Sequence, residues 1–205
     1  MTDKPDLPMT VSEALVFADK KQDGAFPVRA ADGSVVARIA VRWTGSSFEA
    51  TTAEGTPLCS GKHHSAFSRH WEAYIPGGTQ LALVRSSLWG RGKTVTLADG
   101  RELRVGGSAF SRGWTVTDAA GRTVLDADAQ GSSFSFHPDG FAVRCYDDSL
   151  GLAQIVAIVE LNRLIVKAGR NAAAGGGAGA AAGSAWIHRR INAVWHVVGR
   201  GCPAV

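Results

Sequence analysis

Short β-prone runs, in which apolar and polar residues alternate, make up most of the chain from Phe26 to Tyr146. Residue pairs that end in glycine separate these runs, and such pairs favour tight hairpin turns because glycine accepts a positive φ. The pattern predicts six turns, at Asp32-Gly33, Glu54-Gly55, Gly77-Gly78, Asp99-Gly100, Ala120-Gly121 and Asp139-Gly140. Six hairpins amount to twelve antiparallel strands.

One segment, SLGLAQIVAIVELNRLIVKAG at residues 149–169, has a different pattern. Its first half, Leu152 to Val159, is apolar nearly all round a helical wheel, which is typical of a buried helix. Glu160, Asn162 and Arg163 share no single face, and they predict a C-terminal half that contacts water. Either Asp148 or Ser149 is a suitable N-cap, and the last turn holds Lys167 and Gly169, as expected for a helix end.

A membrane-spanning helix is the competing interpretation of this segment. Leu150 to Val166 is 17 residues, which is the lower limit for a span. Glu160 and Arg163 would each cost about 3 kcal/mol near the middle of a bilayer. We therefore expect the helix to be structural.

Two groups of hairpins repeat along the chain. The segment from Phe48 to Leu58 aligns with the segment from Trp114 to Val124 at an offset of 66 residues, and Ala-Asp-Gly at 31–33 recurs at 98–100. The repeat predicts two six-stranded halves, with chance similarity among hairpins as the alternative. Closing twelve strands into a barrel removes every sheet edge and leaves a wide interior, which the apolar helix would fill. The predicted fold class is mainly β, a closed 12-stranded antiparallel barrel around a central hydrophobic C-terminal helix.

The pattern divides the chain into four parts. Residues 1–25 form a peripheral segment in which Thr10 or Ser12 could cap a short helix through Lys20, and residues 26–169 form the barrel with its helix. Residues 170–185 are an Ala/Gly-rich linker. Residues 186–205 are an amphipathic cationic tail, for which membrane adhesion, docking on a protein and disorder are all open.

This organisation resembles the tubby C-terminal-like superfamily, which includes phospholipid scramblase-like folds, and is more similar to its LURP-one-related branch. The repeated Ala-Asp-Gly hairpins, the units led by Phe48 and Trp114, and the closing helix carry the resemblance, which covers Phe26 to Gly169. It implies a closed barrel threaded by its C-terminal helix, and a superfamily associated with phosphoinositide binding and phospholipid handling. It implies no catalytic motif. A scramblase-type cysteine cluster is absent from the sequence, so the resemblance implies lipid binding only as a class.

Charge and cysteine content narrow the function classes. The net charge is +4, but up to Val166 there are 17 Lys and Arg against 18 Asp and Glu, so the basic excess lies after Val166. We expect no nucleic-acid partner. The three cysteines are far apart, and the chain opens without a basic, apolar leader, which favours reduced thiols and the cytoplasm.

Motifs for catalysis are weak. Gly92-Lys93-Thr94 lacks both the first glycine of a phosphate loop and the helix that should follow it. Cys59, His63, His64 and His70 include zinc-ligand types, but the neighbouring Lys62 and Arg69 favour a solvated polar loop. We therefore expect no enzymatic activity, no catalytic residues, no metal site and no cofactor.

Basic residues give the stronger functional signal. Between Arg85 and Arg112 they outnumber acidic residues, and three more arginines lie in the tail. The candidate lipid- or anion-binding residues are Arg91, Lys93, Arg101, Arg104, Arg112, Arg189 and Arg190. We expect a monomeric protein, peripheral at the membrane, that binds acidic phospholipid or tethers a partner there. The alternative is a protein-interaction scaffold with no lipid role.

Overall fold

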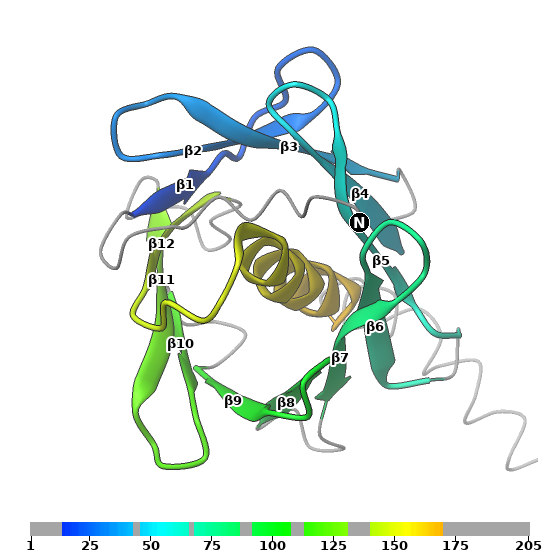
Figure 1. The fold of residues 1–205 in the computed structure, drawn as a ribbon, viewed down its shortest axis with the longest axis vertical. Helices are drawn as coiled ribbons and strands as arrows, with labels where there is room; N and C mark the ends of the chain where they lie inside the picture. The colour runs from blue at the N-terminus through cyan, green and yellow to red at the C-terminus, as the bar shows by residue number, and fades with distance from the viewer. Residues whose placement is uncertain are drawn as a thin grey trace, which may run out of the picture. The chain divides into compact units, whose positions relative to one another are not determined.

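The barrel is built from twelve antiparallel strands. A computed structural model describes residues 14–42, 46–65, 68–86, 92–107, 113–130 and 140–169. The strands are β1 (Leu15–Phe17), β2 (Phe26–Arg29), β3 (Val35–Val41), β4 (Ser47–Thr52), β5 (Pro57–His63), β6 (His70–Tyr74), β7 (Gln80–Ser86), β8 (Lys93–Leu97), β9 (Glu102–Gly106), β10 (Gly113–Thr117), β11 (Thr123–Gln130) and β12 (Gly140–Cys145). Each strand pairs with its sequence neighbours, and β1 pairs with β12 (Figure 1). The sheet is therefore closed, as the sequence predicts.

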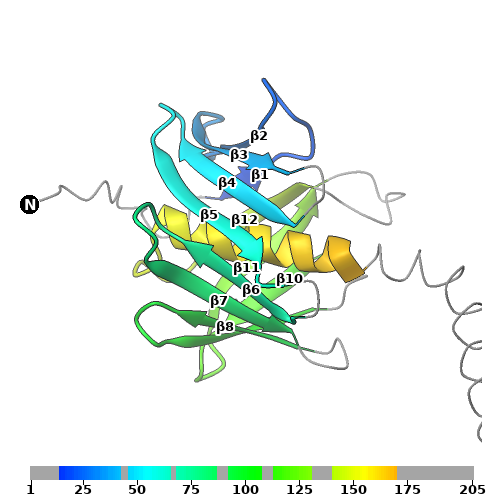
Figure 2. The ribbon, with the colours of Figure 1, turned by 90° about the vertical axis from the view of Figure 1, so that its right-hand side faces the viewer.

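The helix at residues 152–169, here called the central helix, runs through the barrel (Figure 2). Seven consecutive residues, Ile155 to Leu161, are each 0–1% exposed. At 100° per residue such a run passes all the way round the helix, so protein surrounds it on every side. The prediction that this helix is the filling of the barrel is confirmed. Within the described residues, no helix is both long enough and apolar enough to cross a membrane.

The two aligned hairpin units occupy equivalent places in the barrel. They are β4–β5 and β10–β11, six strands apart in the strand order. Phe48 and Trp114, which lead the two units, both face the interior. Each unit also has a register irregularity at the matching step, after Ala50 in one and after Val116 in the other.

The N-terminal boundary of the barrel is corrected by the structure. Leu15–Phe17 is a strand, so both the helix expected to end at Lys20 and the barrel start expected at Phe26 are wrong. The sixth predicted hairpin should supply β12 and a strand before it. The structure instead has β1 paired with β12, so the barrel still has twelve strands. That expected strand falls in residues 131–139, outside the described residues, as do the linker at 170–185 and the tail at 186–205.

The start of the central helix also differs from expectation. The backbone N–H groups of Gln154 and Ile155 donate to the carbonyl of Gly151 at 3.0 and 3.1 Å, so Gly151 is the N-cap in place of Asp148 or Ser149. The side-chain oxygen of Gln154 accepts from the Gly151 N–H at 3.0 Å. This is the return half of a capping box, in which the third helical residue satisfies the cap.

The second half of the helix is drier than its composition suggests. Glu160 is 1% exposed and Asn162 is 4% exposed, so the expectation of water contact is wrong for these two residues, whereas the end of the helix at residues 167–169 is exposed. Burial of these groups is tolerable because each has a partner inside the barrel: Glu160 binds Arg163, and Asn162 accepts from Lys93.

The first prediction concerns the filling of the barrel. Ile158 is 1% exposed, and replacing it with Asp places an unpaired carboxylate among apolar side chains. Such a group costs several kcal/mol, which is comparable to the whole stability of a domain. We expect Ile158→Asp to be insoluble or to show no cooperative thermal transition. Ala168→Asp, at an exposed position of the same helix, should melt like the parent chain, and a cooperative melt for both variants would contradict the buried helix.

A second prediction concerns the closest approach of the wall to the helix. A Cβ atom at Gly61 would lie 2.2 Å from Cε1 of Phe48 and 3.0 Å from Cδ2 of Leu161. Because buried neighbours cannot withdraw freely, Gly61→Ala should lower the free energy of unfolding by about 1–3 kcal/mol. Denaturant titration measures this. Gly92→Ala, where nothing lies within 4 Å of the new atom, is the matched control and should be near neutral.

Candidate functional site

The two ends of the barrel differ in how the strands are connected. At one end, here called the turn end, lie five tight turns and the segment that leads from β12 into the central helix (residues 30–34, 53–56, 75–79, 98–101, 118–122 and 146–151). At the other, here called the loop end, lie the described parts of the remaining connections (residues 18–25, 42, 46, 64–65, 68–69, 92 and 107) and the C-terminal half of the helix. In Figure 2 the turn end is on the left.

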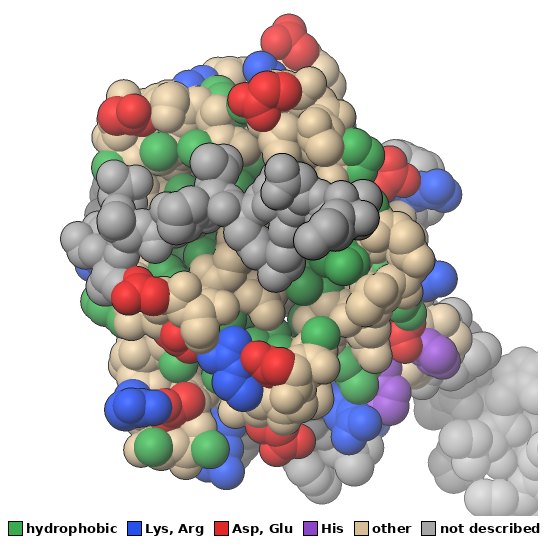
Figure 3. Space-filling model, viewed as in Figure 1, with side chains coloured by type: hydrophobic (Ala, Val, Ile, Leu, Met, Phe, Trp, Pro, Cys, Tyr) green, Lys and Arg blue, Asp and Glu red, His purple; other side chains and the backbone are tan. Residues whose placement is uncertain are grey.

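The turn end is acidic. Its six connections contain six acidic residues and only two arginines, and Figure 3, which looks onto this end, shows acidic side chains spread around it. The acidic residues are Asp32, Glu54, Asp99, Asp118, Asp147 and Asp148, and the arginines are Arg101 and Arg122. Both arginines are paired with carboxylates, at 2.7 Å between Arg101 and Asp99 and at 2.7 Å between Arg122 and Asp118. The net field here repels an anionic surface.

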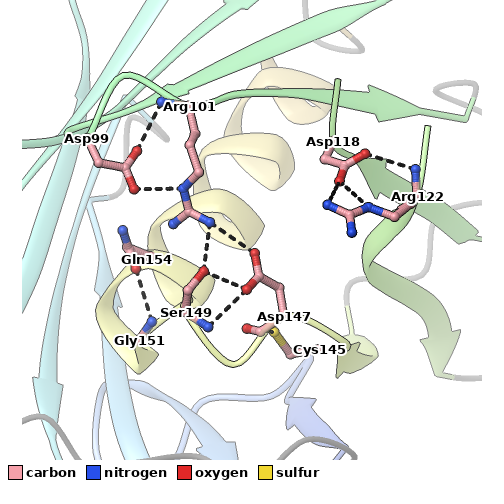
Figure 4. Close-up of polar contacts among 9 residues, drawn as sticks. All are labelled: Asp99, Arg101, Asp118, Arg122, Cys145, Asp147, Ser149, Gly151 and Gln154. Carbon is pink, nitrogen blue, oxygen red and sulfur yellow. Dashed lines mark hydrogen bonds and ion pairs between the residues drawn. The ribbon is translucent and has the colours of Figure 1, made fainter. Parts of the chain in front are cut away.

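Arg101 joins a strand turn to the start of the central helix (Figure 4). Its Nη1 atom lies 3.0 Å from the Asp147 carboxylate and donates to the Ser149 hydroxyl at 2.7 Å. The Ser149 backbone N–H donates to Asp147 at 2.9 Å. Hydrogen bonds from Ser149 and the Arg101 charge together hold the pKa of Asp147 below its ordinary value, despite partial burial. Arg101 is therefore committed to carboxylates of its own chain.

Lys93 is at the loop end and points inward. It begins β8, in which Val95 and Leu97 are buried, and the alternation of a strand puts Lys93 on the same face. Its ammonium donates to Oδ1 of Asn162 on the central helix. Burial lowers the pKa of the Lys93 ammonium from 10.5 to about 8. Among the described residues, no carboxylate forms an ion pair with it.

A second polar group lies at the other side of the same helix segment. Arg163 binds the buried Glu160 at 2.7 Å and places its guanidinium 5.5 Å from the centre of the Phe26 ring. Lys21 approaches the same ring at 5.5 Å. Burial raises the pKa of Glu160, and the neighbouring Arg163 opposes that rise. Burial, reinforced by Glu160, also raises the pKa of Cys59 to about 12, so this thiol is a poor nucleophile.

The structure does not bring the predicted cationic residues into one cluster. Lys93 and Arg101 are at opposite ends of the barrel, and Arg104 is exposed on the outer wall between its partners Thr94 and Thr117. Four other predicted site residues, Arg91, Arg112, Arg189 and Arg190, lie outside the described residues. Of the seven, Lys93 is the one that the described structure places at the mouth of the barrel interior.

The histidine-rich stretch is built into the wall and its surface. His63 stacks on Trp71 with ring centroids 4.4 Å apart and contacts the Ser68 carbonyl at 2.7 Å. His64 lies 2.8 Å from the Glu72 carboxylate, which also accepts from Tyr74 at 2.5 Å. Cys59 is buried in the core, on the same face of β5 as His63. In the part of the chain that the structure describes, no group of three or more His, Cys, Asp or Glu side chains could hold a metal ion.

Two contributors to the loop end were not found from the sequence. The sequence predicts a wet helix position for Asn162 and the first residue of a strand for Phe26, because neither residue type signals a partner by itself. One signal was available for Lys93: in Lys-Thr-Val-Thr-Leu it falls on the apolar side of the alternation. An inward lysine at a strand end is a stronger indication of a site than a count of local charges.

Comparison with known proteins supports the fold. No protein-family profile matches the chain. No curated protein matches it. The barrel is similar to an X-ray structure of a protein from Arabidopsis thaliana, with a TM-score of 0.52 and 18% sequence identity, over 73% of this chain and 87% of that chain. At this identity the likeness shows that the two chains share a fold.

Proposed function

We propose that this protein is a non-enzymatic, tubby-like barrel of the LURP-one-related type that binds acidic phospholipid at the cytoplasmic face of a membrane. The loop end of the barrel is the surface that meets the lipid. The single observation that carries the proposal is the difference in charge between the two ends. A peripheral barrel approaches an anionic surface with its least acidic end, because like charges repel over about a Debye length.

Exposed basic side chains support the loop end as the contact surface. In its described connections, four lysines and arginines stand against two aspartates, whereas the turn end has an acidic excess. The four are Lys20, Lys21, Arg42 and Arg69, all exposed. Long, flexible cationic side chains of this kind contribute about 1 kcal/mol each near an anionic membrane.

A protein-interaction scaffold is the second candidate, and a groove on the outer wall favours it. The groove runs over β4 and β5 to the turn between β6 and β7, and Lys62, Tyr74 and Ile75 are among its lining residues. Within the described residues, Ile75 is one of the few large apolar side chains that are exposed. This candidate predicts a partner on the side of the barrel and no preference for anionic lipid.

Vesicle cosedimentation with single charge reversals tests the proposal. On vesicles of phosphatidylcholine with a quarter phosphatidylserine, Arg42→Glu should weaken binding about tenfold or more, because it removes one attraction and adds one repulsion at the loop end. Arg122→Glu makes the same charge change at the turn end, on a side chain that is 82% exposed, and should change binding about twofold at most. Added salt should weaken binding of the parent chain.

Two further arms separate the proposal from the scaffold. Vesicles of pure phosphatidylcholine should bind far less of the parent chain than anionic vesicles do. The affinity of a chain that ends at Gly169, compared with that of the parent chain, shows how much the tail contributes. The barrel alone should retain part of the affinity. Equal binding to neutral and anionic vesicles, unaffected by salt and by either reversal, would contradict the proposal.

A further inference from the structure

The groove on the outer wall lies over β4 and β5, the strands that face the viewer in Figure 2. Its volume is about 990 Å³, at the upper end of the range for ligand sites, so it is too large for a single ion. Two short outward side chains, Ser47 of β4 and Ser60 of β5, line it and leave room between longer neighbours. The groove can therefore hold an elongated ligand that lies along the strands.

The strand register arranges the outward side chains of the groove in rows. In the row nearest the loop end, the backbone N–H of Arg42 donates to the Ser47 carbonyl at 3.0 Å, and Ser47 pairs with Lys62. In the next row, two residues along each strand, Glu49 pairs with Ser60. Successive rows are about 7 Å apart, because a strand rises about 3.4 Å per residue.

The first row is basic. Arg42 and Lys62 are both exposed and lie on either side of Ser47, so their Cα atoms are about 10 Å apart across two strand spacings. Among the described residues, no carboxylate forms an ion pair with either of them. The Lys62 ammonium lies 5.8 Å from the centre of the Tyr74 ring. One acidic side chain placed over Ser47 would attract both cations.

The second row has the opposite charge. Glu49 is exposed, and within the described part of the chain no cation forms an ion pair with it. This carboxylate would repel the phosphates of a membrane but attract a basic side chain. The alternation of sign over about 7 Å therefore favours a polypeptide ligand over an anionic lipid surface.

The groove ends on apolar side chains at the turn end. Ile75, which is 37% exposed, and Pro76 line it there, together with Pro57 of β5. An apolar side chain of a ligand would remove Ile75 from water, which is favourable. Basic, acidic and apolar groups thus follow one another along about 14 Å of the outer wall.

We propose that this groove binds an extended segment of a partner protein with an acidic, a basic and an apolar side chain at alternate positions. Alternate side chains of an extended chain lie on one side, about 7 Å apart, which matches the spacing of the rows. The acidic side chain lies between Arg42 and Lys62, the basic one at Glu49 and the apolar one on Ile75. The inference rests on the second candidate function, whose partner chemistry it names, and does not depend on lipid binding.

Peptides with exchanged charges test the order of these groups. The capped heptapeptides Ser-Glu-Ser-Lys-Ser-Leu-Ser and Ser-Leu-Ser-Lys-Ser-Glu-Ser carry the pattern in the two chain directions. In their matched controls, Glu and Lys exchange places. NMR titration of the full-length, ¹⁵N-labelled chain follows the amide resonances of Ser47 and Ser60. One of the two pattern peptides should have a Kd about tenfold lower than its control, because attractions at both rows become repulsions in the control.

Exchanging the charges in the protein should reverse this preference. Lys62→Glu combined with Glu49→Lys keeps the net charge, and the control peptide should then bind about threefold more tightly than the pattern peptide. The reversed preference is smaller because Arg42 remains. Glu102→Lys combined with Arg104→Glu makes the same exchange at two exposed positions of β9 and should behave like the parent chain.

The outcomes separate this inference from lipid binding. If anionic vesicles bind but all four peptides bind equally or not at all, the peptide groove is wrong and the lipid proposal stands. If the peptide preference and its reversal are found but vesicles do not bind, the groove is supported and the lipid proposal is wrong. Dihexanoylphosphatidylglycerol below its micelle concentration is the last probe. If it moves the same resonances with a lower Kd than any peptide, the inference is overturned and Arg42 and Lys62 bind a lipid headgroup.

Discussion

The burial of one apolar helix inside a closed sheet is the constraint on which the rest of this structure depends. A twelve-stranded barrel encloses more space than its own inward side chains fill, so without the helix the inner face would contact water. Conversely, a helix that is buried on every side has no amphipathic surface that would be stable in solvent. Barrel and helix are therefore one core, and neither is expected to be stable alone.

This mutual dependence explains details at the turn end. The helix must begin at a fixed depth in the barrel, and the contacts of Arg101 with Asp147 and Ser149 join the β8–β9 turn to the segment that leads into it. Gly151 and Gln154 then satisfy the first helical N–H groups locally. Both arginines at this end are occupied by such pairs and the acidic excess remains, which leaves the opposite end for an anionic ligand.

At the loop end the same packing has a different consequence. Asn162 of the helix accepts from Lys93 of the wall, whereas Arg163 and Glu160 pair with each other within the helix. Arg163 is neutralised by a carboxylate, whereas no carboxylate among the described residues pairs with Lys93. Polar groups buried without full compensation cost stability, and proteins tend to retain them where they serve a function.

Sequence patterns predicted the parts of the fold that depend on residues close together in the chain. The glycine turns at Asp32-Gly33, Glu54-Gly55 and Asp99-Gly100 and the buried helix depend on residues close in sequence, and the structure confirms them. β1 could not be predicted in this way, because three residues between polar segments are a strand only when β12 and β2 offer them partners.

The site was less predictable than the fold, for a related reason. Arg101 and Lys93 look alike in a charge count, yet one pairs with an aspartate 46 residues away and the other with an asparagine 69 residues away. The burial of Glu160 also depends on a barrel wall that surrounds the helix, which periodicity along the helix alone does not reveal. Long-range contacts therefore decide which charges are free to bind a ligand.

Native-state hydrogen exchange tests the mutual dependence of barrel and helix most directly. The measurement compares the amides of Ile155 to Leu161 with those of Ala73, Val84 and Ala127 in the wall, at rising concentrations of denaturant below the unfolding transition. If the two form one core, all should exchange with the same opening free energy, equal to that of global unfolding, and with the same dependence on denaturant. Exchange of the helix amides through a smaller opening, while the wall amides stay protected, would contradict this account.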